Sequence, residues 1–254
     1  MIDAPTGSGK SSVVASLLAE RKGRKVVIAV RTVSQLTTFI RELELVRTKQ
    51  PRLKTVYLVG KSSMCPLGGE GDVYRRCEGV KAFSSSLMRE RAEKGGVIPS
   101  KDPFIIQQIR RMDRDHPLIC PYYINSKMFV QSDTVGVKLV PSTALRTKAD
   151  RVIDHPVVPR ELREFCGDIC PYEVMMHAAR NTDVVILNYH HLFDRDIREQ
   201  LYANLGIEPH DILLLIDEAH NCGDVITSIE SVTLEERDLE QASRELSGMR
   251  LLER

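Results

Sequence analysis

The residues near the start of the chain form a pattern suited to binding phosphate. Segment 4–11 reads Ala-Pro-Thr-Gly-Ser-Gly-Lys-Ser, with alanine where the usual P-loop pattern has glycine, and an apolar run of helical spacing follows. Its glycines allow a tight turn whose N–H groups face one anion, and a following helix adds the positive end of its dipole. The lysine then reaches the β- and γ-phosphates, and the following serine ligates Mg²⁺. The segment predicts a site for ATP and Mg²⁺ made of Thr6, Gly7, Ser8, Gly9, Lys10, Ser11 and Ser12. The alternative is a glycine-rich turn that caps an ordinary helix.

A second group of ionisable residues follows an apolar segment far along the chain. Residues 212–216 read Ile-Leu-Leu-Leu-Ile and lead into Asp217, Glu218, Ala219 and His220. Parallel sheets bind ligands at the carboxyl ends of their strands, so these acids are expected beside the phosphate site. The candidate catalytic residues are Lys10, Asp217, Glu218 and His220. Asp217 would hold Mg²⁺, and Glu218 would orient the attacking water. His220 would link the site to a neighbouring element. The alternative is a solvated strand end in which Asp217 caps the next helix.

The segments between these two motifs alternate between helical and strand patterns. Apolar runs predict buried strands at 25–30, 55–59, 183–187 and 212–216, and helical spacing predicts helices at 9–22, 34–49 and 192–205. Ser34 is a plausible N-cap for the second of these helices. The order predicts an α/β fold of the P-loop NTPase kind, a parallel sheet with helices on both faces.

Residues 61–175 break this alternation and contain five of the six cysteines. The segment has few apolar runs, and helices are expected at 82–94 and 103–113. Candidate metal ligands are Cys65, Cys77, Cys120 and Cys170, three of which precede proline. No zinc-knuckle spacing is present, and an iron–sulfur cluster, zinc and unliganded thiols all stay open on the residues alone. Cys166 could compete with Cys170, and Cys222 is most simply a small core residue.

Composition narrows the class of protein. The chain has 254 residues, 42% of them apolar, and a net charge of only +1, so a strongly basic coat for duplex DNA is not expected. No apolar stretch is long enough for a membrane span, and no secretory signal is visible. We expect a cytoplasmic protein, associated with the nucleoid if the source is prokaryotic.

These motifs together resemble a known family. The P-loop segment, Arg31-Thr32 with Gln35, and Asp-Glu-Ala-His at 217–220 look like superfamily 2 helicases. Three further segments narrow the resemblance: Cys65 in Gly-Lys-Ser-Ser-Met-Cys-Pro, Cys170 in Cys-Pro-Tyr-Glu, and Leu-Asn-Tyr-His-His-Leu at 187–192. With these segments, the chain resembles the XPD family of iron–sulfur DNA helicases over nearly its whole length. The resemblance implies a RecA-like fold interrupted by a mostly helical [4Fe–4S] domain, and ATP-driven 5′-to-3′ unwinding of the kind used in DNA repair. It also implies that Arg31, Thr32 and Gln35 lie near single-stranded DNA, and the alternative for these three is a role at the strand end or as helix caps.

The resemblance also suggests how the chain is divided. Residues 1–60 and 176–227 would form the first helicase domain, 61–175 the iron–sulfur domain, and 228–254 the start of an arch-like helical domain. A second motor domain, which would complete the ATP site with arginines, is expected elsewhere in a longer protein, so this chain alone should hydrolyse ATP slowly. The expected partners are single-stranded and forked DNA, and the protein is expected to be monomeric. The competing hypothesis is a non-motor metal-binding module with a vestigial P-loop that docks nucleic acid or a protein partner.

Overall fold

The computed structural model describes residues 12–68, 73–93, 119–132 and 136–231, with 236, 239–240 and 242–244. The chain divides into two compact units, Met1–Ala219 and His220–Arg254. The P-loop segment 4–11 and the helix expected at 103–113 lie outside the described residues. Among the helices that are described, none combines the length and the apolar character needed to cross a membrane.

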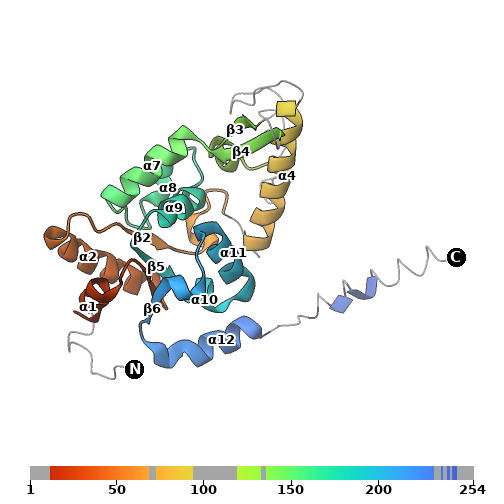
Figure 1. The fold of residues 1–254 in the computed structure, drawn as a ribbon. Coiled ribbons are helices and arrows are strands. Elements are labelled where there is room, and N and C mark those ends of the chain that lie inside the picture. Colours follow the sequence, from red (N-terminus) through yellow and green to blue (C-terminus); the bar gives the residue numbers. More distant parts are fainter. Residues whose placement is uncertain are drawn as a thin grey trace. The chain divides into compact units, whose positions relative to one another are not determined.

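A parallel sheet forms the centre of the first unit (Figure 1). Within the described residues it has four strands in the order β2-β5-β1-β6. Their bounds are β1 (Lys25–Val30), β2 (Thr55–Leu58), β5 (Val184–Asn188) and β6 (Ile212–Ile216). Ala29 pairs with Leu187 of β5 and Ile216 of β6, so these three strands end at nearly the same level. The predicted strands and the α/β class are confirmed, with shifts of a single residue at some strand ends. The prediction that 212–216 is buried was wrong, because β6 is an edge strand among the described residues and its Leu214 is 42% exposed.

The strands form because their side chains are apolar on both faces. Val26, Val27, Ile28, Ala29 and Val30 of β1 are each at most 2% exposed. β-branched residues suit this extended, doubly covered position, which explains why the sequence shows a continuous apolar run rather than alternation. The sheet is therefore a rigid apolar layer whose polar residues are confined to its strand ends.

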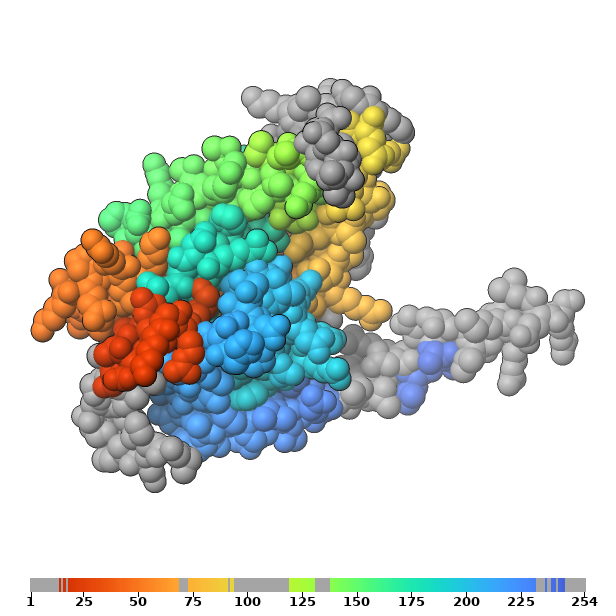
Figure 2. Space-filling model, viewed as in Figure 1, coloured from red at the N-terminus to blue at the C-terminus, as the bar shows by residue number. Residues whose placement is uncertain are grey.

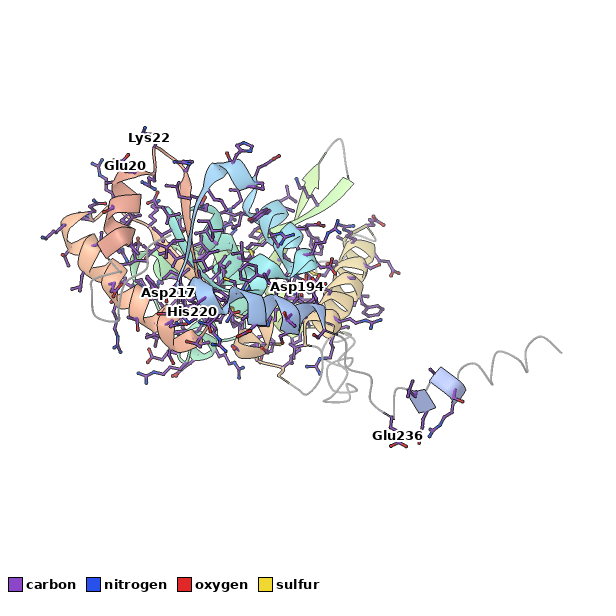
Figure 3. All side chains as sticks on the ribbon, turned by 90° about the horizontal axis from the view of Figure 1, so that it is seen from below. Glu20, Lys22, Asp194, Asp217, His220 and Glu236 are labelled. Carbon is purple, nitrogen blue, oxygen red and sulfur yellow. The ribbon has the colours of Figure 1, made fainter. Side chains whose placement is uncertain are left out.

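Two helices on one side of the sheet come from the first part of the chain. Helix α1 (Ser12–Glu20) ends before Lys22 and Gly23, whose positive φ values of 46° and 85° turn the chain into β1 (Figure 3). Helix α2 (Val33–Lys49) packs against β1, β2 and β5. Its N-cap is Thr32, so the prediction of Ser34 as the cap was wrong. Thr32 is the N-cap instead of Ser34 because Gln35, three residues after Thr32, completes a reciprocal capping box with it, which Ser34 could not form.

The connection from β1 to β2 and the connection from β2 to β5 run across the sheet in opposite directions. Because crossovers between parallel strands are right-handed, the helices that follow β2 lie on the other face of the sheet. Helix α9 (Pro171–Arg180) packs against β2 and leads into β5. The single helix expected at 192–205 is wrong, because α10 (His190–Phe193) and α11 (Arg195–Leu205) are separated at Asp194. Asp194 has extended backbone angles and accepts a hydrogen bond from the Ile197 N–H (3.0 Å), so it caps α11 (Figure 3).

The segment between β2 and α9 contains helices and a hairpin. Its elements are α3 (Lys61–Met64), α4 (Val73–Glu93), α6 (Pro121–Asn125), β3 (Lys127–Ser132), β4 (Gly136–Pro141), α7 (Thr143–Asp154) and α8 (Leu162–Cys166). The helix expected at 82–94 is the second half of the longer α4. Met88, Ile119 and Ile124 form a small apolar cluster here. Helix α7 packs on α9 and β2, and Figure 2 shows this green segment against the teal one, so the insert adjoins the sheet directly.

The chain leaves the sheet through short helical turns. A 3₁₀ turn, η1 (Pro209–Asp211), precedes β6, and a second, η2 (Ala219–Asn221), follows it. Helix α12 (Cys222–Glu230) belongs to the second unit.

Candidate nucleotide site and cysteine pocket

The ends of three neighbouring strands are joined by hydrogen bonds around Asp217. Its backbone N–H donates to the Ala29 carbonyl (2.9 Å), which continues the β1–β6 ladder by one residue. The Tyr189 N–H donates to the Val30 carbonyl (2.9 Å), and the Tyr189 hydroxyl donates to the carbonyl of Asp217. The side-chain amide of Asn188 donates to the Arg31 carbonyl (3.0 Å). The carboxyl edge thus fixes the backbone of the acidic motif, labelled at Asp217 in Figure 3, against the segment that follows β1.

The acidic pair has an unusual backbone. Glu218 has a φ of 53°, in the left-handed region that residues other than glycine rarely adopt. Both Asp217 and Glu218 are partly buried. Strained residues of this kind persist where the surrounding structure holds them, and they gather at functional sites. The arrangement can present two carboxylates to a magnesium nucleotide at the sheet edge.

The predicted DNA-contact residues lie at the same edge. Thr32 and Gln35 are engaged with each other, since Gln35 Oε1 accepts from the Thr32 N–H (2.9 Å) and the Gln35 N–H donates to Thr32 Oγ1 (3.3 Å). The capping role that the sequence left open is therefore present. Arg31 is exposed at the start of this turn. Contact of these three residues with DNA stays a prediction.

Sequence reasoning did not assign site roles to Asn188 and Tyr189. Asn188 Oδ1 also accepts from the His190 N–H (3.0 Å) and lies 2.8 Å from His190 Nδ1. Because its amide nitrogen donates to the Arg31 carbonyl, the Asn188 side chain joins the end of β5 to the end of β1. Both residues directly follow an apolar strand between β1 and β2. Their position at a shared carboxyl edge was the signal that could have found them.

Several predicted residues are not brought into this site by the described structure. Thr6, Gly7, Ser8, Gly9, Lys10 and Ser11 lie outside the described residues, and Ser12 is described only as the first residue of α1. His220 belongs to the second unit, where its Nε2 lies 3.0 Å from Asn221 Nδ2. The approach of Lys10 to Asp217 therefore stays a prediction.

The four candidate cysteines of the insert gather in one region. Cys65, Cys77 and Cys120 line one pocket with apolar neighbours such as Val73 and Val80. Cys170 is close enough that Cys120 and Cys77 contribute to the rise in its pKa, after the larger effect of burial. Cys65 ends α3, Cys120 and Cys170 are the N-caps of α6 and α9 with proline at the next position, and Cys77 lies within α4. Four separate elements thus supply one thiol each.

Burial raises the pKa of three of these thiols, those of Cys77, Cys120 and Cys170. It raises the pKa of Cys120 to about 12, although the Tyr123 N–H, 3.4 Å from the sulfur, partly offsets the rise. Among the described residues, no three histidine, cysteine or acidic side chains converge on a position for a single metal ion. Three of the thiols line one pocket, and Cys170 is not among the residues that line it.

The two remaining cysteines lie elsewhere. Cys166, in α8, is fully buried, and burial raises the pKa of its thiol to about 11. It contributes, after the larger effect of burial, to the rise in the pKa of Tyr57 on β2, and it is not among the residues that line the cysteine pocket. Cys222 is in the second unit. The geometry thus favours Cys170 over Cys166 as the fourth candidate.

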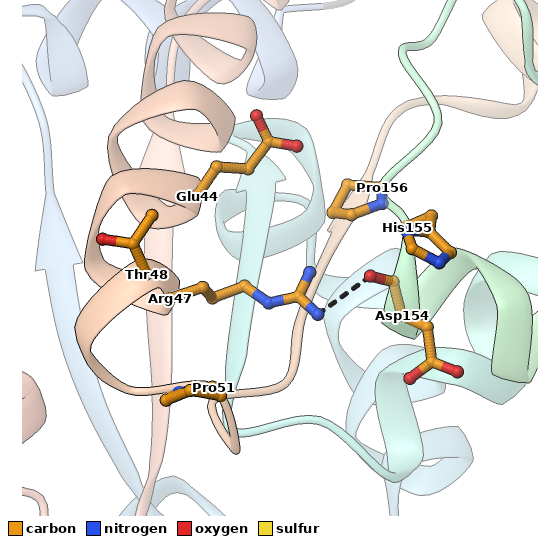
Figure 4. Close-up of a pocket in the computed structure, with 7 residues that line it drawn as sticks. All are labelled: Glu44, Arg47, Thr48, Pro51, Asp154, His155 and Pro156. Carbon is orange, nitrogen blue, oxygen red and sulfur yellow. Dashed lines mark hydrogen bonds between the residues drawn. The ribbon is translucent and has the colours of Figure 1, made fainter.

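A further pocket lies at the opposite edge of the sheet (Figure 4). It is lined by Glu44, Arg47, Thr48, Pro51, Asp154, His155 and Pro156. Arg47 points across it and donates to the Asp154 carbonyl (2.9 Å). Because α2 starts at the carboxyl edge and ends here, this pocket is remote from Asp217 and has no part in the nucleotide site.

Comparisons with known proteins agree with this geometry. The family model DEAD_2 matches residues 160–239. The chain is 25% identical to the ATP-dependent DNA helicase CHL1 of Kluyveromyces lactis over 85% of its length, and 27% identical to the ATP-dependent DNA helicase DDX11 of Mus musculus over 90%. It spans 22% of the length of each of these relatives. A solved structure named Truncated XPD matches with a TM-score of 0.52 at 22% identity, covering 94% of this chain and 52% of that one.

The parallel sheet with helices packed against it places the chain in the α/β fold class, with an acidic pair at the carboxyl edge of the sheet. The fold is similar to that of the structure named Truncated XPD, and most of the sequence is similar to part of two proteins named ATP-dependent DNA helicases.

Proposed function

We propose that this chain is the ATP-binding portion of a DNA helicase of the XPD type, which couples ATP hydrolysis to 5′-to-3′ movement on single-stranded DNA and to duplex unwinding. The observation that carries the proposal is the position of Asp217 and Glu218. They follow the parallel strand β6, and hydrogen bonds join Asp217 to the end of β1 and to Tyr189, which follows β5. Ligands of such folds bind at this edge. The relatives named as ATP-dependent DNA helicases support the same function.

The ATP site would combine this edge with the P-loop. Lys10 would bind the β- and γ-phosphates, while Ser11 and Asp217 would hold Mg²⁺ directly and through water. Glu218 would orient the water that attacks the γ-phosphate. His220 would carry the state of the nucleotide to a neighbouring element.

Exchange of Lys10 for alanine tests the nucleotide site. The Lys10→Ala chain should bind a fluorescent ATP analogue roughly 10- to 100-fold more weakly, because a hydrogen bond to a charged group is lost. Lys49→Ala, at an exposed position near the end of α2, is the matched control and should bind as the parent does. Equal binding by Lys10→Ala and the parent would favour the alternative of a vestigial P-loop.

Single-stranded and forked DNA are the proposed partners, with the protein acting as a monomer in the cytoplasm or beside the nucleoid. Arg31 would contact a phosphate, while Thr32 and Gln35 hold the turn. Arg31→Gln should weaken binding of a single-stranded oligonucleotide and reduce the salt slope by about 0.7. Arg41→Gln, exposed on α2, is the control. An unchanged salt slope in Arg31→Gln would remove Arg31 from the DNA track.

We further propose that Cys65, Cys77, Cys120 and Cys170 hold a [4Fe–4S] cluster. The fit rests on three thiols that line one pocket and on a fourth, Cys170, whose pKa is raised by burial and by the charges of its neighbours, Cys120 and Cys77 among them. A cluster has several iron positions and suits ligands that do not converge on one point, whereas tetrahedral zinc needs convergence. When bound, the group would supply a covalent cross-link between four elements and one-electron redox chemistry.

Serine variants test this assignment on protein purified without oxygen. Serine at each of the four positions should lower bound iron and sulfide, whereas Cys166→Ser and Cys222→Ser should leave both at the parent level. Zinc in place of iron in the parent chain would overturn the cluster but leave the ATP site untouched. Loss of iron in Cys166→Ser with retention in Cys170→Ser would reverse the choice of the fourth ligand.

A further inference from the structure

A group of charged side chains beside the cysteine pocket has no role in the proposed catalysis. It consists of Lys61, Lys81, Lys127, Glu78 and Glu173, which we term the lysine–glutamate network. Lys81 Nζ lies 2.8 Å from Glu173 Oε1 and 3.7 Å from Glu78 Oε1. Lys127 Nζ lies 2.7 Å from Glu173 Oε2, and Lys61 pairs with Glu78. The five side chains form one continuous chain of ion pairs.

The network is largely withdrawn from water. The side chains of Lys61, Lys81 and Glu173 are 4%, 19% and 14% exposed. Aromatic rings cover the lysines, with Lys61 Nζ 3.9 Å from the ring centre of Tyr74 and 5.0 Å from that of Tyr172. Buried charges cost free energy unless they are closely paired, so a network of this size requires a reason for its presence.

The charges persist at neutral pH. Burial alone would raise the pKa of Glu173, but the charges and hydrogen bonds of Lys81 and Lys127 hold it at about 2. Burial alone would lower the pKa of Lys81, but the charges of Glu173 and Glu78 raise it. Glu173 is therefore a carboxylate and Lys81 an ammonium group in the folded protein.

The network joins the same elements that carry the cysteines. Lys61 lies on α3, which ends at Cys65, and Glu78 and Lys81 share α4 with Cys77. Glu173 lies on α9, in the first turn after its N-cap Cys170. The ring of Tyr123, on the helix that Cys120 caps, lies 5.4 Å from Lys81 Nζ and 5.1 Å from Lys127 Nζ. Each helix that carries or adjoins one of the four candidate cysteines therefore contributes to the lysine–glutamate network or contacts it.

The network also has an unequal number of charges. Three lysines face two glutamates, so one positive charge is not offset within the network. That charge lies beside the pocket, because Lys81 shares α4 with Cys77 and Lys61 lies on α3, directly before Cys65, and both cysteines line the pocket. An anion in the cysteine pocket would complete the charge balance.

We propose that the lysine–glutamate network is the electrostatic support of the group held by the four thiolates and sets its reduction potential. This rests on the cluster assignment made above. One-electron reduction by an external donor adds one negative charge to the cluster and its thiolates. A buried lysine nearby stabilises the reduced form, and a buried carboxylate destabilises it. Lys81 and Glu173 are positioning residues, acting through charge rather than by ligation.

Two substitutions with opposite expected signs test this role. In titrations with dithionite under argon, followed by visible absorption and electron paramagnetic resonance, Lys81→Gln should shift the reduction potential to a more negative value. Glu173→Gln should shift it to a more positive value. Each variant leaves two ion pairs in place: Lys61 with Glu78 in both, Lys127 with Glu173 in Lys81→Gln, and Lys81 with Glu78 in Glu173→Gln. Glu199→Gln, in an exposed pair with Arg195, is the matched control and should leave the potential unchanged.

The results separate this inference from the cluster assignment. Iron content equal to the parent with shifts of the same sign, or with no shift, would overturn the network's electrostatic role and leave the cluster in place. A parent chain that takes up no iron would overturn both. If Glu173→Gln does not fold, Glu78→Gln, at a 33% exposed position, replaces it and should give a smaller positive shift. A negative or absent shift there would count against the proposal.

Discussion

Strand β1 and helix α4 bury their side chains against very different neighbours. Ile28 of β1 pairs with Ile186 and Leu215 and is fully enclosed by apolar strands. Helix α4 instead places Glu78 and Lys81 inside the insert, with ion pairs to α3 and α9. Both regions belong to one compact unit.

The contrast shows two ways of holding functional groups in place. The sheet fixes Asp217 through close packing and a hydrogen-bond ladder, which tolerates little change in volume. The part of the insert around α4 and α6 has a small apolar cluster, and charges, rings and helix caps help to position its thiols. The first arrangement suits a rigid phosphate site, and the second suits a centre whose electrostatics can be adjusted. Four predictions test this contrast.

The largest expected effect is in the sheet. Ile28→Ala should lower the free energy of unfolding by about 4 kcal/mol, because it leaves a cavity between two strands that cannot close around it. Urea denaturation followed by circular dichroism measures the change. Val33→Ala, at a 42% exposed position, is the control and should change stability little. A loss in Ile28→Ala no greater than that of the control would show that the sheet is not the rigid region.

A buried histidine lies where the sheet edge approaches the insert. Burial lowers the pKa of His191 to about 4, against an ordinary value of 6.5. Between these values the unfolded chain takes up a proton that the folded chain does not, so stability falls as pH drops from 6.5 towards 4. The loss is about 3 kcal/mol by proton linkage.

Urea midpoints measured across this pH range test the histidine. His191→Leu should flatten the pH dependence, while the same change at His210, whose side chain is 78% exposed, should leave the dependence as in the parent. Equal slopes for the parent and His191→Leu would assign the acid sensitivity to other groups.

A smaller and local effect is expected in the insert. Met88→Ala should cost about 2 kcal/mol, since few apolar neighbours surround it. Hydrogen exchange should show lost protection in α4 and α6 with little change in β1. Met128→Ala, at a 37% exposed position, is the control. Equal loss of protection in β1 would mean that the sheet and the insert unfold together. The two regions would then differ in the kinds of side chain they bury and not in their local stability.

The smallest effect is at the start of α2. Thr32→Ala should lower stability by about 1 kcal/mol, because the capping box with Gln35 is lost. Thr32→Ser keeps the hydroxyl and should remain near the parent in thermal denaturation. A variant that loses DNA binding without losing stability would show that Thr32 contacts the nucleic acid as well as capping the helix.

Local sequence patterns were sufficient for the central elements. A continuous apolar run such as 25–30 predicts a buried parallel strand, because each residue must be compatible with two covered faces. The place of Asp217 at the carboxyl edge followed from the strand that precedes it. The choice of Thr32 over Ser34 as the cap and the break at Asp194 did not follow, since several polar residues there could cap a helix and only the packed backbone selects one.

The sequence by itself determined the chemistry that this protein carries: an apolar strand that ends in two acids, a phosphate-binding motif and four cysteines of one insert. Only the tertiary structure decided which of these groups meet. Cys65, Cys77 and Cys120 come to one pocket from separate elements, and Lys61, Lys81 and Glu173 form ion pairs across three helices. The reason is that periodicity along the chain reports on burial, whereas pairing between distant residues depends on how the elements pack, which no local spacing encodes.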